Sequence, residues 1–473
     1  MSINIVLIAA VVAGGLGILA RGRWRVPLLL VVSALAVYAL QPNLPIRYLD
    51  FWLPTLTLAL AALSWVLTTP RPQRSWKDNW LAVVILISVS LAMGLTRYLN
   101  ISLPLPVSRP PTVQSLLLAE GAVLLLALIL ARFTLPGPAA LKISIVLLIL
   151  ALVATKVPSV AQQISIALRS LSGQSTAAVV VLDFRWLGFS YIVFRLLHTL
   201  FDRLSGRLPA VSMGEYVVYV IFFPALAAGP IDRIERFISD LHAPFALTFG
   251  DSGEAGKRLV VGMFKKFAVA DTLALIALNG SNALQVHSAG WAWVMLYAYA
   301  FQIYFDFSGY TDIAIGLGRL MGIKLPENFK SPYLKPNITQ FWNSWHMTLT
   351  QWFRAYYFNP VTRAMRSARK PMSIPAIIFF TQLSTMILIG MWHGITWNFF
   401  LWGLWHGLGL FAQNRWSESM KARAVGLTPR WQSTLNAGSV FLTFNFVALG
   451  WVFFALPVPS SSLQFMQTLF GLG

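Results

Sequence analysis

The chain has 473 residues, of which 57% are apolar and 11% are charged, whereas soluble domains carry about 25% charged residues, so the composition excludes a soluble domain and indicates an integral membrane protein. The absence of cysteine excludes disulfides, thiolate nucleophiles and cysteine-based metal sites. We attribute most of the formal net charge of +20 to positive-inside loops and to attraction for anionic membrane lipids, and we expect no nucleic-acid partner.

Continuous apolar runs recur along the chain and predict an all-α polytopic membrane protein rather than a β-barrel. The runs cover 3–20, 26–41, 49–69, 80–96, 113–135, 141–155, 177–202, 213–231, 260–279, 289–323, 373–391, 396–413 and 434–457. At about 20 residues per span, they amount to roughly eleven to thirteen membrane segments. The short loops at 21–25 and 71–77 are basic, which favours an N-terminus outside the cytoplasm. Beyond residue 230 basic clusters no longer alternate with the runs, which indicates re-entrant or interfacial helices.

The distribution of polar residues divides the chain into three predicted parts. Residues 1–176 hold no histidine and are expected to form N-terminal transmembrane helices. Residues 177–413 hold all six histidines and are expected to form the functional core, and residues 414–473 to form a C-terminal membrane segment. No internal repeat is visible, which counts against an inverted-repeat transporter.

Two segments upstream of residue 320 carry polar groups in apolar surroundings. In "FFPALAAGPIDRIERF" (222–237), mixed charges after Gly229-Pro230 predict a turn at the surface or at the rim of a cavity. In "YFDFSGYTDIAIG" (304–316), Asp306 and Tyr310 are four residues apart and share a helix face. We favour pairing of the Asp306 carboxylate with an arginine or a hydroxyl of another segment over a direct functional role.

The segment 330–361 mixes many aromatic residues with polar ones and contains no long apolar stretch. Its polar and aromatic residues of most interest are Asn343, Trp345, His346 and Arg354. Pro336-Asn337 predicts the start of a helix and Asn359-Pro360 its end. We expect a helix that is embedded at shallow depth or lines a cavity, and the alternative is an interfacial belt of tryptophan and tyrosine.

The stretch "MWHGITWNFF" (391–400) places His393 just before Gly394, at the joint between two apolar runs. An imidazole in hydrocarbon is costly unless it is paired or functional. His406 follows 13 residues later, and on one continuous helix a net rotation of about 220° would turn the two imidazoles to different sides. No two histidines are four residues apart, so we predict no metal site.

Histidines on different segments, without a nucleophilic cysteine, favour acid–base chemistry on a hydroxyl group. A neutral imidazole accepts a proton at working pH. Attack of an alcohol on an activated acyl group requires such a base, alignment of the reactants and stabilisation of the oxyanion.

Four motifs follow one another within roughly 178–413: "GPIDRIERF", "FDFSGYTDIAIG", "NFKSPYLKPNITQFWNSWHMTLTQWFR" and "MWHGITWNFFLWGLWHG". Together they resemble the membrane-bound O-acyltransferase (MBOAT) family and, within it, the bacterial branch that modifies cell-surface polymers by O-acetylation or D-alanyl transfer. In one departure, Ala355 follows Trp-Phe-Arg where relatives commonly carry an aspartate.

The resemblance implies a multi-pass protein of the bacterial plasma (inner) membrane with a central funnel. His393 matches the main active-site histidine of the family and His346 the second one. The residues of these motifs that we expect to contact substrate are Trp392, Trp345, Asn343, Arg354, Asn398, Asp306 and Tyr310. The family implies no tightly bound cofactor but an acyl thioester co-substrate, either acyl-coenzyme A or an acyl carrier protein, that arrives from the cytoplasm.

The expected acceptor is a hydroxyl of an extracytoplasmic glycopolymer or of a partner protein. One alternative is a lipid O-acyltransferase of the same family, and another is a membrane transporter. For the donor we expect a docking strip of the basic residues Arg363, Arg366, Arg369 and Lys370. The three arginines recur at i, i+3 and i+6, which favours one helix face, and thioester donors are polyanions. Anchoring to lipid headgroups is the alternative for this strip.

Overall fold

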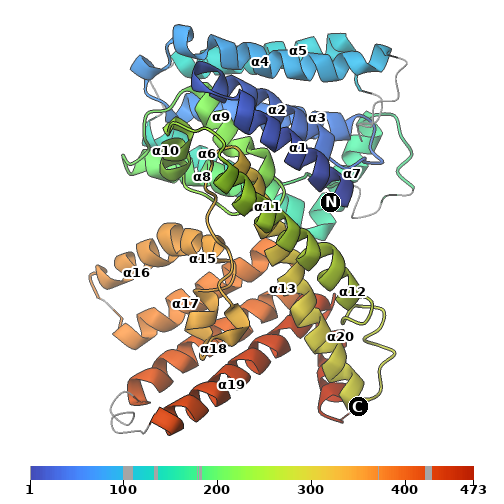
Figure 1. Ribbon diagram of the computed structural model, residues 1–473, viewed down its shortest axis with the longest axis vertical. Helices are drawn as coiled ribbons and strands as arrows, with labels where there is room; N and C mark the ends of the chain where they lie inside the picture. Colours follow the sequence, from blue (N-terminus) through green and yellow to red (C-terminus); the bar gives the residue numbers. More distant parts are fainter. Residues whose placement is uncertain are drawn as a thin grey trace. The chain divides into compact units, whose positions relative to one another are not determined.

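The computed structural model describes residues 2–99, 110–132, 137–177, 179, 184–370, 372–420 and 429–472, and every regular element among them is a helix or helical turn (Figure 1). The predicted all-α class is therefore confirmed. The chain divides into two units. The first unit is Met1–Leu259 with Ile313–Leu325, and the second unit is Val260–Asp312 with Pro326–Gly473. The predicted boundaries near residues 176 and 413 stay a prediction.

The first unit contains most of the long apolar helices. Its helices are α1 (Ile3–Leu19), α2 (Arg25–Leu40), α3 (Leu49–Thr68), α4 (Trp76–Leu95), α5 (Val113–Arg132), α6 (Pro138–Lys156), α7 (Pro158–Leu171), α8 (Phe189–Leu204), α9 (Met213–Ile221), α10 (Ile234–His242) and α11 (Phe249–Met263), whose last turn belongs to the second unit. Helix α9 packs against α2, α3 and α4. At its centre the buried Tyr216 hydroxyl bonds to Ser64 and Thr199, each at 2.7 Å.

Among the described residues, seven helical segments are long and apolar enough to cross a membrane. They are Gly22–Leu40, Leu49–Thr68, Trp76–Tyr98, Val113–Arg132, Pro138–Lys156, Ile374–His393 and Trp431–Ala455. Some predicted apolar runs form shorter helices. The run at 213–231, for example, leaves the α-helix after Ile221 because Pro224 lies in a 3₁₀ turn (η5, Phe223–Ala225). The total number of crossings stays a prediction.

Buried charges hold η5 and the segment that follows it in the first unit. The Arg195 guanidinium, 2% exposed, donates to the carbonyls of Val220 and Ala225, each at 2.7 Å. Asp232 is also buried and pairs with Arg236 at 2.7 Å. The predicted surface position holds for Arg233, Glu235 and Arg236, which are exposed, and is wrong for Asp232, which is buried and paired with the Arg236 cation.

The second unit carries the histidine-containing motifs. Its elements are the π-helical turn η6 (Phe264–Ala270), α12 (Asp271–Ala274), α13 (Ala289–Leu320), the 3₁₀ turn η7 (Pro332–Leu334), α14 (Ile338–Trp342), α15 (Met347–Phe353), the π-helical turn η8 (Arg354–Phe358), α16 (Asn359–Arg366), α17 (Ile374–His393), α18 (Trp397–Met420), α19 (Pro429–Ala455) and α20 (Pro459–Leu469). Helix α13 contributes its residues up to Asp312 to this unit and the remainder to the first unit.

Helices α17 and α18 form a tight hairpin, which Figure 1 shows beside α19. A Cβ atom at Gly390 would lie 2.2 Å from the carbonyl oxygen of Phe399, and one at Gly403 would lie 2.6 Å from Cα of Ile387. Small residues at these positions let the two backbones approach closely, as in other membrane helix pairs. The hairpin fixes the end of α17, where His393 lies.

The segment 330–361 is helical, but in separate pieces. The predicted start is confirmed, because the Asn337 side chain accepts the Gln340 N–H at 2.9 Å and caps α14. Asn343–His346 then interrupts the helix. The predicted end at Asn359-Pro360 is wrong, since these residues begin α16. Proline is tolerated in the first turn of a helix, where its missing N–H is not needed.

Candidate functional site

His393 is the last residue of α17, and the chain turns into extended backbone at Gly394. The predicted position at a helix end is therefore confirmed. A Cβ atom at Gly394 would lie 2.7 Å from the Phe399 ring, so only glycine fits this turn without displacing that ring. The C-terminal end of a helix carries partial negative charge, which stabilises the positive charge that an imidazole gains when it accepts a proton.

His346 occupies a different backbone setting, at the N-cap of α15. Its backbone is left-handed, with φ 42° and ψ 52°. A residue other than glycine pays about 1–3 kcal/mol for such a conformation, and such residues cluster at functional sites. The His346 side chain is 2% exposed, and burial lowers the pKa of this imidazole, which lies outside the seven apolar spans, to about 3. His346 is therefore neutral at physiological pH.

The indole of Trp392 connects the two histidines. Its ring centroid lies 4.6 Å from that of His393 and 6.2 Å from that of His346. The two imidazoles come from positions 47 residues apart, on α17 and at the start of α15. The sequence could not establish that these histidines lie near each other, and the structure brings both into contact with one tryptophan.

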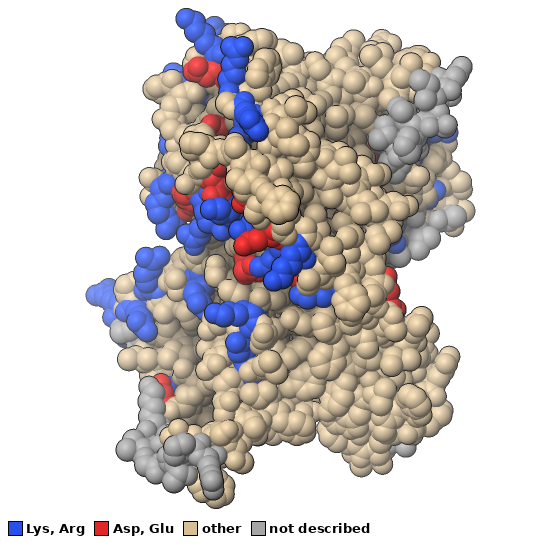
Figure 2. All heavy atoms as spheres, viewed as in Figure 1, with Lys and Arg blue, Asp and Glu red and all other residues tan. Residues whose placement is uncertain are grey.

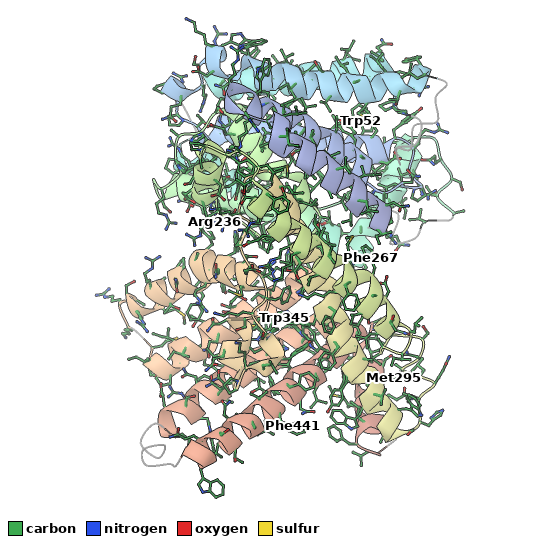
Figure 3. The ribbon with its side chains drawn as sticks, viewed as in Figure 1. Trp52, Arg236, Phe267, Met295, Trp345 and Phe441 are labelled. Carbon is green, nitrogen blue, oxygen red and sulfur yellow. The ribbon has the colours of Figure 1, made fainter. Side chains whose placement is uncertain are left out.

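Aromatic rings surround this histidine pair within the second unit. His346 packs edge-on against Phe307 of α13 at 4.7 Å, and His393 packs against Phe454 of α19 at 4.8 Å. Trp345, labelled in Figure 3, is 4% exposed and contacts Phe329 and Trp451, each at 5.1 Å. Its predicted contact with substrate stays a prediction, while its observed role is to pack this aromatic cluster.

His406 lies on α18, separated from His393 by the break at 394–396, so the two residues are not on one continuous helix. Trp402 lies between them, with ring centroids 5.8 Å from His393 and 4.8 Å from His406. The His406 ring is fully buried against Trp342 as well, at 5.2 Å. His406 therefore belongs to the aromatic packing beside the histidine pair.

A cavity of about 310 Å³ is formed by α14, α15, η8, α17 and α18. Two predicted substrate-binding residues line it, and they bond to each other, since Arg354 donates from Nη2 to Oδ1 of Asn343 at 2.7 Å. Arg354 opens the π-helical turn η8, and such turns occur frequently at functional sites. Trp342 and Ile389, four residues before His346 and His393 respectively, also line the cavity.

The remaining predicted substrate-binding residues lie in other surroundings. Asp306 pairs with Lys266 of η6, so the favoured structural pairing is found, with a lysine as the partner instead of an arginine or hydroxyl. Tyr310 lies one turn further along α13 and is partly buried. The buried Asn398 donates from Nδ2 to the carbonyl of Leu456 at 2.6 Å, which joins α18 to the end of α19.

The basic strip is exposed at all four positions, and Figure 2 shows lysine and arginine side chains gathered over α16. The prediction that Arg363, Arg366 and Arg369 share one helix face is wrong. Helix α16 ends at Arg366, so Arg369 and Lys370 follow the helix instead of extending its face. The Ser367 hydroxyl bonds to the Arg363 carbonyl at 3.0 Å, and this competition for a helical carbonyl helps to end the helix.

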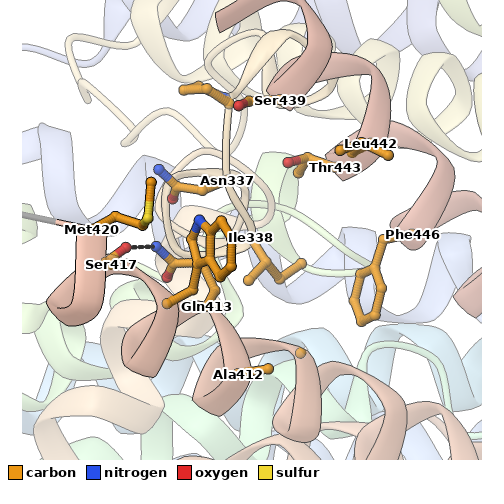
Figure 4. Close-up of a pocket in the computed structure, with 13 residues that line it drawn as sticks. Asn337, Ile338, Ala412, Gln413, Ser417, Met420, Ser439, Leu442, Thr443 and Phe446 are labelled. Carbon is orange, nitrogen blue, oxygen red and sulfur yellow. Dashed lines mark hydrogen bonds between the residues drawn. The ribbon is translucent and has the colours of Figure 1, made fainter. Parts of the chain in front are cut away.

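A larger groove of about 660 Å³ lies between α18, α19 and Pro336–Ile338 (Figure 4). It contains none of the predicted site residues. Gln413 lines this groove and bonds to Ser417 at 2.6 Å, while its Oε1 accepts the hydroxyl of Thr339, which lines the smaller cavity, at 2.6 Å. The Thr339–Gln413 bond thus joins a residue of the smaller cavity to a residue of the groove.

In the first unit, the ligand atoms of His198, Asp202 and Glu235 lie within 4.8 Å of one another. Their bonds, however, are already made within the protein. The Ile234 N–H donates to Nε2 of His198 at 3.3 Å, and Arg207 pairs with Asp202 at 2.8 Å. A metal would have to displace the first bond and bind beside the Arg207 cation, so this donor set fits a metal poorly. The predicted absence of a metal site stays a prediction.

The buried His346 imidazole gives a prediction for stability against pH. Its pKa falls from 6.5 to about 3 on folding, so below pH 6.5 the unfolded chain binds a proton that the folded chain does not. Stability is therefore lost as the pH falls. Relative to His346→Gln, the wild type should lose up to about 1.4 kcal/mol per pH unit between about pH 6 and pH 4. Unfolding midpoints of the two proteins in detergent, measured across this range, check the difference, and parallel curves would contradict it.

Comparison with known proteins gives one family and several relatives. The family model described as "MBOAT, membrane-bound O-acyltransferase family" matches residues 147–456. The chain is 36% identical over 269 residues to a probable alginate O-acetylase of Pseudomonas syringae pv. tomato. The aligned region covers 57% of this chain and 48% of that relative. The chain thus spans about half the length of this relative.

Two further relatives carry different names. A teichoic acid D-alanyltransferase of Streptococcus thermophilus is 30% identical over 288 residues, covering 57% of this chain and 68% of that relative. A peptidoglycan O-acetyltransferase of Helicobacter pylori is 34% identical over 271 residues, covering 54% of this chain and 47% of that relative.

Proposed function

Because the chain belongs to the membrane-bound O-acyltransferase family, we propose that it transfers an acyl group from a thioester donor to a hydroxyl group of a bacterial cell-surface polymer. The acyl group is of the acetyl or D-alanyl type, and the hydroxyl belongs to a glycopolymer or to a partner protein that passes the group on. The names of the relatives, which refer to alginate, teichoic acid and peptidoglycan, support this class of acceptor. The observation that carries the proposal is the contact of His346 and His393 with one tryptophan.

In this proposal His393 is the general base. Its neutral imidazole removes the proton from the acceptor hydroxyl as the oxygen attacks the thioester carbonyl. The new C–O bond forms, the C–S bond breaks, and the proton passes from His393 to the leaving thiolate. The C-terminal end of α17 supports this role because it stabilises the imidazolium formed during the step.

His346 has a different role in the same step. It lies at the N-terminal end of α15, where partial positive charge disfavours protonation of the imidazole, and its burial has the same effect. A ring that stays neutral carries one N–H donor, which suits hydrogen bonding to the oxyanion that develops on the thioester carbonyl. Of the two histidines, His393 is the base and His346 polarises the carbonyl.

The chain is a multi-pass membrane protein, and we place it in the bacterial inner membrane with the donor on the cytoplasmic side. Reconstituted proteoliposomes test the transfer. Acetyl-coenzyme A or a D-alanyl carrier protein is enclosed, and alginate, teichoic acid or peptidoglycan fragments are supplied outside. Mass spectrometry should detect ester on one acceptor with wild-type protein. Ester formation at the level of protein-free liposomes with every pair would contradict the proposal.

We also propose that the exposed basic strip docks the polyanionic donor. Reversing Arg363 and Arg366 to glutamate should raise the apparent KM for the donor about tenfold and weaken its dependence on salt, because the attraction lost is electrostatic. Reversing the exposed pair Arg21 and Arg23 in the first unit is the matched control, with the same change in net charge. Equal effects of both pairs would show that only the overall charge matters.

The sidedness of the strip has its own test. The exposed Ala368 can be replaced by cysteine without a background signal because the chain has no other cysteine. The Ala368→Cys variant should react with a membrane-impermeant maleimide in inverted vesicles and not in intact cells. Labelling from outside intact cells would place the strip on the face opposite to a cytoplasmic donor.

A further inference from the structure

The N-terminus of α15 lacks the usual capping arrangement. The first N–H groups of a helix have no partner within the helix, and an N-cap side chain commonly accepts one of them. At α15 the N-cap residue is His346, and its side chain makes no capping bond. Its backbone is also left-handed, a conformation that L-residues rarely adopt. Something other than His346 must hold this turn.

Asn328, 18 residues upstream of His346, supplies the missing cap. Its carbonyl accepts the Met347 N–H at 3.0 Å. Its side-chain Oδ1 accepts the Thr348 N–H at 3.2 Å and the Thr348 hydroxyl at 2.6 Å. Asn328 is 0% exposed, so these bonds are protected from competition by water. The cap therefore comes from a distant residue and leaves the imidazole of His346 unused for capping.

The loop at 328–330, which contains Asn328, also bonds to the backbone before His346 and packs against a ring that contacts the imidazole. The Lys330 N–H donates to the Ser344 carbonyl at 3.0 Å, two residues before His346. Phe329, next to Asn328, packs against Phe307 at 5.1 Å, and Phe307 is the ring that contacts the His346 imidazole at 4.7 Å. The loop at 328–330 thus restrains both the backbone and the ring surroundings of His346.

We infer that Asn328 is a positioning residue, which holds the His346 backbone in its left-handed conformation and so directs the imidazole toward the reacting thioester. The inference rests on the proposed acyl transfer. Catalysis is sensitive to such positioning, since a displacement of about 1 Å in a reacting group can cost on the order of 100-fold in rate. A residue that merely stabilised the fold would change the unfolding temperature without a selective effect on His346.

The test compares two buried or half-buried caps in the purified full chain. Asn328→Ala removes the side-chain cap of α15, and Asn337→Ala removes the equivalent cap of the neighbouring α14, where Oδ1 accepts the Gln340 N–H at 2.9 Å. Both variants should unfold at a lower temperature than wild type, and Asn328→Ala at the lower one, because its Oδ1 is buried and accepts two bonds whereas that of Asn337 accepts one. Asn328→Ala should lower the kcat of thiol release from the donor about 10- to 100-fold, with the KM for donor within about twofold of wild type. Asn337→Ala should change kcat by less than about threefold.

A second pair of variants covers the case in which Asn328→Ala does not fold. Thr348→Val keeps the side-chain shape but removes the hydroxyl that donates to Oδ1 of Asn328. Thr348→Ser keeps that hydroxyl. Thr348→Val should lower kcat about three- to tenfold, and Thr348→Ser should restore kcat to within about twofold of wild type. Equal kcat values for the two variants would contradict the inference.

Chemical labelling of His346 gives a readout that does not depend on activity. Diethyl pyrocarbonate acylates accessible imidazoles, and peptide mapping resolves each histidine. Asn328→Ala should raise the labelling rate of His346 about fivefold, because loss of a cap increases local opening by about that factor. The buried His406 should be labelled at its wild-type rate. Unchanged labelling of His346, or equal increases at both histidines, would overturn the inference. If the wild type releases no thiol at all, the proposed function fails, and the labelling still decides the role of Asn328.

Discussion

The His393→Ala variant is expected to keep its fold but to transfer the acyl group about 10²–10⁴-fold more slowly. This is the range that a general base typically contributes. His393 ends α17, is partly buried and contacts Trp392, Phe454 and Trp402. Truncation removes the imidazole that we propose accepts the hydroxyl proton. The measurement is ester formation on the acceptor at saturating donor.

His287→Ala is the matched control, because His287 is an exposed histidine of the same unit. It should transfer the acyl group at close to the wild-type rate. An His393→Ala protein that elutes and unfolds as wild type does, and still transfers at near-wild-type rate, would remove His393 from the mechanism.

Replacement of His346 is the second change with a large expected effect. His346→Ala and His346→Gly both remove the buried imidazole, and both should lower kcat about 100-fold or more, as loss of an oxyanion-stabilising donor does. Their stabilities should differ. Glycine adopts the left-handed backbone of this position without strain, so His346→Gly should be more stable than His346→Ala by roughly 1–2 kcal/mol.

The pair of variants separates the chemistry of the side chain from the stability of the turn. If activity follows stability, with His346→Gly clearly more active than His346→Ala, the imidazole has no chemical role. The double variant His393→Ala/His346→Ala adds a further comparison. If the two histidines act together in one step, the double variant should lose little more activity than the less active single variant. Fully multiplicative losses would assign the histidines to separate steps.

The sequence was sufficient to predict the helical membrane class and the position of His393. Long apolar runs determine the helical membrane class, and Gly394 between two such runs indicates that His393 lies at a helix end. Both depend on local composition and spacing, which a single sequence displays directly. The start of α14 at Asn337 was predictable for the same reason, since an asparagine cap acts within its own helical turn.

The predictions that failed depended on backbone geometry and burial, which residue types alone do not show. Asn359-Pro360 resembles a helix end, but the π-helical turn before it continues the helix into α16. Asp232 carries the polarity of a surface residue, yet it is buried against Arg236. Asn328 was missed because its bonds reach residues 19 and 20 positions away, and no local pattern marks an asparagine as the cap of a remote helix.

The placement of the two histidines around Trp392 could not be predicted from the sequence either. It requires the break at 343–346, the left-handed residue His346 and the close α17–α18 hairpin, and each of these depends on tertiary packing. The order of motifs indicated which histidines to consider. Only the structure shows that both meet one indole ring.

Thiol release from an acyl thioester by purified protein tests the central claim most directly. The chain has no cysteine, so a thiol-reactive dye reports only the thiol that leaves the donor. Wild type should release thiol from acetyl-coenzyme A or from an acyl-loaded carrier protein faster than buffer does, and His393→Ala should fall to the buffer rate. Wild-type release at the buffer rate with both donors, or equal release by wild type and His393→Ala, would contradict an acyltransferase that uses His393 as its base.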